Sequence, residues 1–328
     1  SKRLKNEIKS KISETVSETY IAKETNVSVH TVRRIIDDTA RLLTIKPLHD
    51  LPEHLCFDEF KSVKSSDSNM SFIICDSITH KLVDVVRDRK SYSLKQYFYR
   101  FEPKTRLKVK TISIDMYLPY IQLIKEMFPN AKIIIDPFHI VQALNRELNR
   151  TRVRIMNQHR YKNPKLYRKL KHYWKLILKN PNELQNYKYN RYKLFESFIT
   201  SKGIVDYILE NNLSLKNDYE VVHSLRECIQ DRDYIEFKKT IEAATQLGLS
   251  PGLKRVLKTL MTYLPYIQNT CEHPTRTNGP IEGINNKIKV LKRNAYGFRN
   301  YYHFRNRIIL ITKMFSPKQK GIKQQLVA

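Results

Sequence analysis

Residues 112–136 read ISIDMYLPYIQLIKEMFPNAKIIID, and they give the clearest indication of the fold class. Two short apolar runs, residues 109–115 and 132–136, have the length and the β-branched content of buried strands. Between them, residues 117–128 carry apolar side chains at helical spacing. A strand, a helix and a second strand in this order predict a crossover unit within a sheet that has parallel pairing.

The segments upstream of this unit extend the sheet. Three more strands are predicted at residues 54–61, 70–76 and 81–87, and a helix at residues 91–101. Three strands in hairpins followed by two strand–helix crossovers argue for an α/β fold, with a mixed sheet covered by helices. This order of elements is also that of the ribonuclease H fold.

The charge of the chain points to a polyanionic partner. Lys and Arg number 60 against 32 Asp and Glu in 328 residues, a net charge of +28, which favours nucleic acid first and an anionic membrane second. The chain has 7 glycines and neither a G-x-x-x-x-G-K-[ST] nor a G-x-G-x-x-G motif, which argues against nucleotide-driven chemistry. It has no run of 18 apolar residues and no signal peptide. We expect a cytoplasmic, nucleoid-associated protein without a nucleotide cofactor or membrane contact.

Residues 1–46 predict a helix-turn-helix DNA-binding region. The string ETYIAKETNVSVHTVRRIIDD at 18–38 places one short helix over 17–24 and another, with a serine N-cap, over 28–38. Asn26 suits the left-handed conformation of a tight turn between them. An ordinary helical hairpin is the alternative. In a helix-turn-helix the second helix enters the major groove, and its exposed candidates are His30, Thr31, Arg33 and Arg34.

Two segments hold much of the positive charge. Residues 150–193 contain 14 Lys and Arg and one acid, whereas the chain after Glu282 contains 11 Lys and Arg and no acid. This surplus predicts phosphate contacts, made after Glu282 by Lys289, Lys292 and Arg293. Trp174 and six tyrosines interleave the first segment. We expect the tyrosines to be core residues rather than platforms for unpaired bases, and they are Tyr161, Tyr167, Tyr173, Tyr187, Tyr189 and Tyr192.

Three carboxylates have the positions of catalytic acids. Asp58 lies within an apolar strand, Asp115 ends a strand, and Glu282 begins a basic helix. A buried carboxylate is costly unless it is paired or binds a metal, and strand ends in α/β sheets converge on the functional face. Together the three could hold two divalent ions for in-line phosphoryl transfer, with Mg²⁺ favoured and Mn²⁺ second. For each aspartate taken singly, capping is the alternative role.

Other acids compete with these three. Asp136 ends the last predicted strand and could be a fourth ligand or a supporting residue, with His139 nearby. Asp76 and Asp84 lie in predicted strands, and Glu59 should point to the sheet face opposite that of its neighbour. No G-x-S-x-G motif is present, which argues against Ser/His/Asp hydrolysis.

Three stretches resemble the DDE transposases of the ISL-three insertion-sequence family. They are CFDEFKSVK at 56–64, residues 112–152 beginning ISIDMYLPY, and TNGPIEGINNKIKVLKRNAYGFRNYYHFRNRI at 277–308. The three occur in the family's order, and the resemblance covers nearly the whole chain from the predicted helix-turn-helix onward. The family usually has a cysteine-rich zinc-binding segment before that region, and none is present, so we expect a shortened or decayed start.

The resemblance implies a ribonuclease H-like core interrupted by a helical insertion before the last acid. It implies that Asp58, Asp115 and Glu282 form the catalytic and metal-binding triad. Asp136 is the alternative second member, and we favour Asp115 because the fourth core strand of this fold lies beside the first. The implied ranges are 54–140 and 271–315 for the two parts of the core, 141–270 for the basic insertion and 316–328 for a basic tail.

The sequence therefore predicts a DNA transposase of an insertion sequence. Such an enzyme cuts at the terminal inverted repeats and joins the ends to target DNA, without ATP, as a homo-oligomer on DNA. The alternative is a catalytically silent DNA-binding relative that acts as a repressor or domesticated protein. A structure-specific nuclease of the same fold is a third hypothesis.

Overall fold

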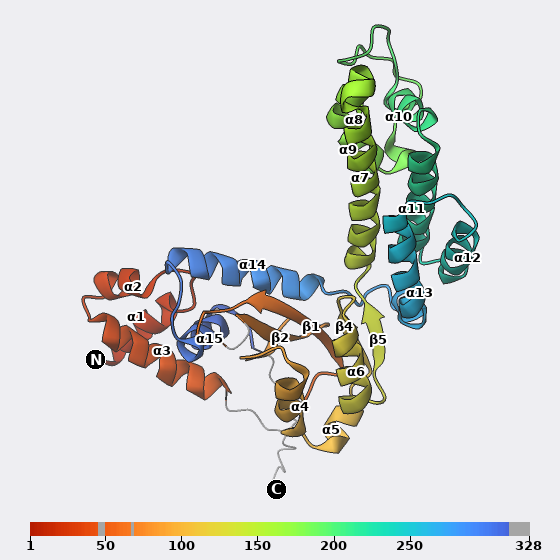
Figure 1. Ribbon diagram of the computed structural model, residues 1–328. Coiled ribbons are helices and arrows are strands. Elements are labelled where there is room, and N and C mark those ends of the chain that lie inside the picture. The colour runs from red at the N-terminus through yellow and green to blue at the C-terminus, as the bar shows by residue number, and fades with distance from the viewer. Residues whose placement is uncertain (45–49, 67–68, 315–328) are drawn as a thin grey trace, which may run out of the picture. The chain divides into compact units, whose positions relative to one another are not determined.

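The computed structural model of the protein describes residues 1–44, 50–66 and 69–314 (Figure 1). The chain divides into two units, which are described separately. Unit 1 combines Ser1–Ile134 with Thr275–Ala328, and unit 2 is the segment Ile135–Pro274. The predicted basic tail at 316–328 lies outside the described residues, as do the last two positions of the predicted 1–46 region.

Three helices open unit 1: α1 (Lys2–Lys11), α2 (Glu18–Glu24) and α3 (Val29–Thr44). α2 begins after Ser17, whose hydroxyl accepts a hydrogen bond from the Tyr20 amide at 3.1 Å. Between α2 and α3, Asn26 has a φ of 50°, which confirms the left-handed turn predicted there. Apolar side chains from all three helices form one buried cluster, which includes Ile8, Ile21, Val32 and Ile36.

Five strands form one sheet in the order β3-β2-β1-β4-β5. Their bounds are His54–Lys61 for β1, Met70–Asp76 for β2, Leu82–Val86 for β3, Thr111–Ile114 for β4 and Lys132–Ile135 for β5. β1 pairs antiparallel with β2 and parallel with β4, and β2 pairs antiparallel with β3. The mixed sheet is confirmed, and the observed ends of the strands differ from the predicted ones by no more than two residues.

Helices supply apolar partners to both faces of the sheet. Their bounds are Ser91–Tyr99 for α4, Pro103–Leu107 for α5, Leu118–Met127 for α6, Gly279–Asn294 for α14 and Tyr301–Ile311 for α15. Phe57 of β1 stacks on Phe98 of α4, with ring centroids 5.6 Å apart. Cys56 and Phe60 of β1 belong instead to the cluster formed with α14 and α15. Because side chains alternate along a strand, Asp58 points to the same face as Cys56 and Phe60.

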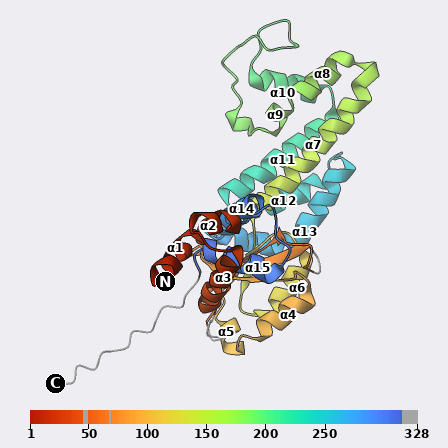
Figure 2. The same ribbon diagram turned by 90° about the vertical axis from the view of Figure 1, so that its left-hand side faces the viewer.

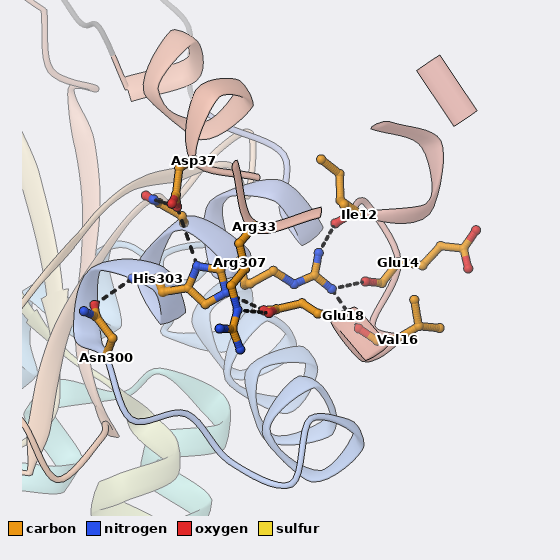
Figure 3. A network of polar contacts seen from close by, with 10 residues as sticks. Ile12, Glu14, Val16, Glu18, Arg33, Asp37, Asn300, His303 and Arg307 are labelled. Carbon is orange, nitrogen blue, oxygen red and sulfur yellow. Dashed lines mark hydrogen bonds and ion pairs between the residues drawn. The ribbon is translucent and has the colours of Figure 1, made fainter. Parts of the chain in front are cut away.

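Polar contacts join the N-terminal helices to α15 (Figure 3). Glu18 of α2 accepts hydrogen bonds from the ring of His303 and from Arg33. Burial raises the pKa of Glu18, but these two donors outweigh burial and hold the pKa below its usual value. Arg307 is fully buried. Its guanidinium donates to three backbone carbonyls in the segment between α1 and α2, those of Ile12, Glu14 and Val16.

Unit 2 is helical, and none of the described helices of the chain is long and apolar enough to cross a membrane. Its elements are α7 (Pro137–Lys162), α8 (Pro164–His172), α9 (Trp174–Leu178), the 3₁₀ turn η1 (Pro181–Glu183), α10 (Ser201–Glu210), α11 (Leu213–Asp231), α12 (Tyr234–Ala244) and α13 (Pro251–Glu272). The long helix α7 packs against α11 and α13 (Figure 1).

Buried polar groups hold the helices of unit 2 together. Asp218 of α11 is fully buried and accepts hydrogen bonds from the Thr151 hydroxyl at 2.8 Å and the Ser250 amide at 2.9 Å. The Asp218 carboxylate thereby connects α11 to α7 and to the start of α13. The Thr270 hydroxyl accepts from the Ile135 amide at 3.0 Å, so the first and last parts of unit 2 are bonded to each other.

His223 of α11 is buried in its neutral form. An arginine can only donate, so the contact of 3.2 Å from Arg226 identifies Nδ1 of His223 as an acceptor. Nε2 then carries the proton and donates to the Ile177 carbonyl at 3.0 Å. Burial disfavours the charged form and lowers the pKa of His223 to about 4.

The tyrosines of the basic segment differ from their predicted core placement. Tyr173 is buried, as predicted. The prediction is wrong for Tyr161, Tyr187 and Tyr189, which are 84%, 80% and 65% exposed. The last two lie between η1 and α10, in a segment that forms no helix and therefore has no helical face to direct them toward the core.

Candidate active site

Asp58 and Asp115 lie level with each other on neighbouring parallel strands. The β1–β4 register pairs Cys56 with Ser113. Two further steps in this register bring Asp58 opposite Asp115, just past the end of β4. Paired positions of parallel strands direct their side chains to the same face, so both carboxylates lie on the face occupied by α14. Both side chains are half-buried.

Two asparagines of the α14 segment bind these aspartates. Nδ2 of Asn285 donates to Oδ2 of Asp58 at 2.8 Å. Nδ2 of Asn278 donates to Oδ1 of Asp115 at 3.2 Å and to the Phe57 carbonyl at 3.1 Å. Ionised carboxylates only accept hydrogen bonds, so the amide nitrogens must face them. Within the described part of the chain, Oδ1 of neither asparagine has a hydrogen-bond partner, although both atoms are buried.

Glu282 lies on α14 between the two asparagines. It follows Asn278 by four residues and precedes Asn285 by three, and these spacings place the three side chains along one side of the helix. Ile281 and Ile284 are buried against the sheet, whereas Glu282 is exposed. Glu282 lies in the first turn of the helix, as predicted. The two asparagines are not among the predicted site residues, although both stand in the quoted stretch at 277–308, in the sequence NGPIEGIN at 278–285.

The competing acids of unit 1 have structural partners. Asp84 accepts hydrogen bonds from Arg305 at 2.6 Å and from a tyrosine hydroxyl at 2.9 Å. Glu59 lies on the opposite sheet face, as predicted, where it accepts from the Tyr120 hydroxyl at 2.6 Å. Asp76 accepts from the backbone amide two residues further along at 2.9 Å. These contacts explain the three acids as parts of the fold.

Asp136 and His139 belong to unit 2. Asp136 is the first residue after β5 and caps α7, since its Oδ1 accepts from the Phe138 amide at 3.1 Å. His139 lies in the first turn of α7, with its ring edge-on to Phe138 at 5.4 Å between centroids. In the sheet β4 lies beside β1 and β5 lies one strand further out, so the strand that ends at Asp115 is the direct neighbour of the strand of Asp58.

The chemistry of the donor set fits a hard divalent cation. Asp58, Asp115 and Glu282 offer carboxylate oxygens, the ligands that Mg²⁺ and Mn²⁺ accept most readily. The asparagine amides fix the orientation of one oxygen of each aspartate, and the Glu59 amide donates to the other oxygen of Asp58 at 2.7 Å. These residues could therefore hold the metal that the sequence predicts.

Comparison with known proteins identifies the family. A family model described as "Transposase", that of the ISL-three DDE transposases, matches residues 55–308. The chain belongs to this ISL-three transposase family. It is 28% identical to a transposase for insertion sequence element IS1001 from Bordetella parapertussis over 286 residues, which are 87% of this chain and 67% of that protein. It is 35% identical over 130 residues to a Lactococcus lactis subsp. lactis protein named "ATP-dependent protease", and spans 40% of that protein's length.

In this ISL-three transposase, two of the cations predicted to contact DNA bind groups of the protein itself. They are Arg33 and Lys292. Nε of Arg33 lies 3.0 Å from Oε2 of Glu18. Nζ of Lys292 donates to the carbonyls of Lys61 and Ser62, each at 2.9 Å, and burial lowers the pKa of Lys292. Arg33 is still exposed, and so are the other three predicted cations, Arg34, Lys289 and Arg293.

Proposed function

We propose that the protein is a DNA transposase of an insertion sequence, with a ribonuclease H-like core that cuts transposon ends and joins them to target DNA. The observation that carries the proposal is the level placement of Asp58 and Asp115, with the helix of Glu282 bonded to both through asparagines. The strand order supports a ribonuclease H-like core, and membership of the ISL-three family supports the reaction class.

In this proposal Asp58, Asp115 and Glu282 are the catalytic residues and hold the metal. Two bound Mg²⁺ ions, or Mn²⁺ in their place, would activate the attacking oxygen and stabilise the departing one in an in-line displacement at phosphorus. Asn278 and Asn285 act as positioning residues, because each fixes the orientation of one aspartate. Asp136 and His139 are supporting residues.

DNA is the proposed partner, in the form of the terminal inverted repeats and the target. The α2–turn–α3 segment would act as a helix-turn-helix that presents Arg34, while Arg33 is engaged by Glu18. Exposed Lys289 and Arg293 on α14 would contact the phosphate backbone, so affinity would fall steeply with added salt. Two ends must be brought together, which implies a homo-oligomer on DNA, acting in the cytoplasm at the nucleoid. The chain lacks the G-x-x-x-x-G-K-[ST] motif that binds ATP. We therefore base the proposed activity on the IS1001 transposase and the family model, and not on the relative named "ATP-dependent protease".

End cleavage in Mg²⁺ tests the triad. Asp58→Asn, Asp115→Asn and Glu282→Gln should each abolish cleavage and strand transfer on a duplex that carries the element's terminal inverted repeats. They should still bind that duplex, because each substitution removes negative charge near the DNA. Glu126→Gln is the matched control: this carboxylate lies in the exposed part of α6, pairs with Lys95 at 2.5 Å, and should leave cleavage unchanged.

Asp136→Asn separates the two candidates for the second acid. Full loss of cleavage in Asp115→Asn with residual cleavage in Asp136→Asn is the expected pattern. Full cleavage by Asp58→Asn or Glu282→Gln would refute the proposal and favour a DNA-binding protein without catalysis. Cleavage without joining to target DNA would instead indicate a structure-specific nuclease.

A further inference from the structure

The helices α8, α9 and α10 lie together at one end of unit 2 (Figure 2). Residues of α8, α9 and the loop before α10 line a basic pocket that contains one indole ring. Its volume is about 470 Å³, and it is lined by Arg168, Lys171, His172, Trp174, Lys193 and Leu194. None of these residues is acidic. Over the described ranges, no ion pair involves Arg168, Lys171 or Lys193. The three basic side chains of the pocket therefore make no salt bridge within unit 2.

The walls of this pocket are fixed by contacts behind them. Tyr173 is buried between α8 and α9, and its hydroxyl donates to the Lys193 carbonyl. Its ring lies 5.8 Å from that of Phe195, measured between centroids. Nζ of Lys169 lies 4.1 Å from the Phe195 ring centroid and 3.9 Å from that of Tyr207 on α10. These contacts hold the loop with Lys193 against both α8 and α10.

The same loop contains a residue in a strained backbone conformation. Leu194 has a φ of 70°, in the left-handed region that a branched side chain rarely adopts. Such a conformation persists where the surrounding contacts determine it, and it is concentrated at ligand-binding sites. Here the contacts of Tyr173 and Lys169 on either side of Leu194 maintain it, and the result is that Lys193 and Leu194 both line the pocket.

The side chains that line the pocket indicate the kind of ligand that it could bind. Trp174 is 38% exposed, and flat aromatic rings stack on such a surface. The surrounding guanidinium and ammonium groups favour phosphate. A nucleotide supplies both groups, but within a duplex each base is already stacked on its neighbours. Only an unpaired nucleotide can offer its base to Trp174.

We propose that this pocket binds an unpaired nucleotide of a DNA strand, with its base against Trp174 and the phosphates on either side of it against the pocket's cations. The choice of DNA rests on the proposed function. A strand is favoured over a free mononucleotide because Arg168, Lys171 and Lys193 can engage successive phosphates. The site lies wholly within unit 2 and extends the chain's contacts with DNA beyond the triad and the predicted helix-turn-helix.

Tryptophan fluorescence gives a direct test, since Trp174 is the only tryptophan in the chain. The full chain is titrated with a short oligothymidylate, with a duplex of the same length and with thymidine monophosphate. Saturable quenching by the single strand, with little from the duplex or the mononucleotide, is expected. Equal quenching by the monophosphate at the same nucleotide concentration would identify a mononucleotide site and overturn the assignment to a strand.

Substitutions separate stacking from charge. Trp174→Leu should weaken single-strand binding, followed by the anisotropy of a labelled strand, by roughly tenfold, whereas Trp174→Phe should retain most of it. Lys193→Gln should weaken binding and reduce the slope of log affinity against log salt by about 0.7, the value for one phosphate contact on a single strand. Lys216→Gln, an exposed lysine on α11 outside the pocket, is the matched control and should change neither.

Unchanged single-strand binding by Trp174→Leu, or a loss equally large in Trp174→Phe, would overturn the stacking role. Failure here is distinguishable from failure of the proposed function. Asp58→Asn should still show the quenching, because binding in unit 2 does not need catalysis. If Asp58→Asn retained full end cleavage, the transposase proposal would fail while the quenching test of this pocket remained valid.

Discussion

Replacing Arg307 by methionine should release the N-terminal helices from α15. The guanidinium is fully buried, and it donates to the carbonyls of Ile12, Glu14 and Val16 at 2.6, 3.0 and 2.9 Å (Figure 3). Methionine occupies a similar length of apolar volume but cannot donate a hydrogen bond. Arg307→Met therefore removes the polar link while it retains much of the packing.

The size of the effect can be worked from these contacts. A hydrogen bond from a charged donor contributes about 1.5–3 kcal/mol, so three contribute roughly 4.5–9 kcal/mol before the cost of burial. Burial lowers the pKa of Arg307 from 12.5 to about 10, and at 1.36 kcal/mol per pKa unit this cost is ~3 kcal/mol. The difference leaves a central value of about 3 kcal/mol for the free energy of unfolding that Arg307→Met should lose.

Urea unfolding and amide hydrogen exchange measure this loss. In Arg307→Met, the midpoint followed by far-ultraviolet circular dichroism should fall, and the amides of α1 and α2 should exchange faster while those of α7 keep their rates. Arg299→Met is the matched control. Arg299 is exposed and lies just before α15, so its replacement should change the free energy of unfolding by less than ~0.5 kcal/mol. A change of less than ~0.5 kcal/mol in Arg307→Met itself would show that the three hydrogen bonds only offset the cost of burying the guanidinium.

Other substitutions probe unit 2 and α14. The folded state keeps His223 neutral, with a pKa of about 4 against 6.5 for the ordinary side chain. The folded state of unit 2 is therefore fully stable above pH 6.5 and should lose about 3 kcal/mol of its free energy of unfolding as the pH falls toward 4. Unfolding followed by Trp174 fluorescence measures this loss. A His223→Gln variant that kept this pH dependence would exclude the histidine as its source. Gly252→Ala should destabilise unit 2 by roughly 1–3 kcal/mol in the same assay, since a Cβ there would lie 2.2 Å from Oε2 of buried Glu147. Gly283→Ala, with no atom within 4 Å of its Cβ, should instead stabilise α14 by about 0.5–1 kcal/mol, and a lower melting temperature would contradict that expectation.

The sheet could be predicted because its strands are short, apolar and separated by clear turns. Each strand is recognisable from its own residues, and the topology then needs only the order of elements along the chain. The contacts of Asn278 and Asn285 could not be predicted in this way, because more than two hundred residues separate them from β1. The sequence places Glu282 at the start of a basic helix but does not indicate which amide of that helix reaches an aspartate.

The sequence predicts how much positive charge the protein carries, but not which of the basic side chains pair within the fold. A count of lysines and arginines predicts a polyanion-binding protein. It does not distinguish Arg33, which pairs with Glu18, from Arg34, although both are exposed. The prediction that the tyrosines are core residues fails for a related reason. In a segment with a helical pattern an aromatic residue is expected to be buried, but Tyr187 and Tyr189 lie in a segment that forms no helix and are exposed.

The insertion of unit 2 between β5 and α14 has a consequence for synthesis on the ribosome. The 140 residues of Ile135–Pro274 must be translated after Asp115 before α14 emerges, which takes roughly 7–28 s at ~5–20 residues per second. During this interval the sheet has no α14 or α15 to cover its Cys56 face. The hydrogen bond between Thr270 and Ile135 joins the two ends of the inserted unit, and both ends are translated before α14. A nascent chain that ends before α14 thus lacks Glu282, and the three proposed catalytic acids can be assembled only after α14 has been translated.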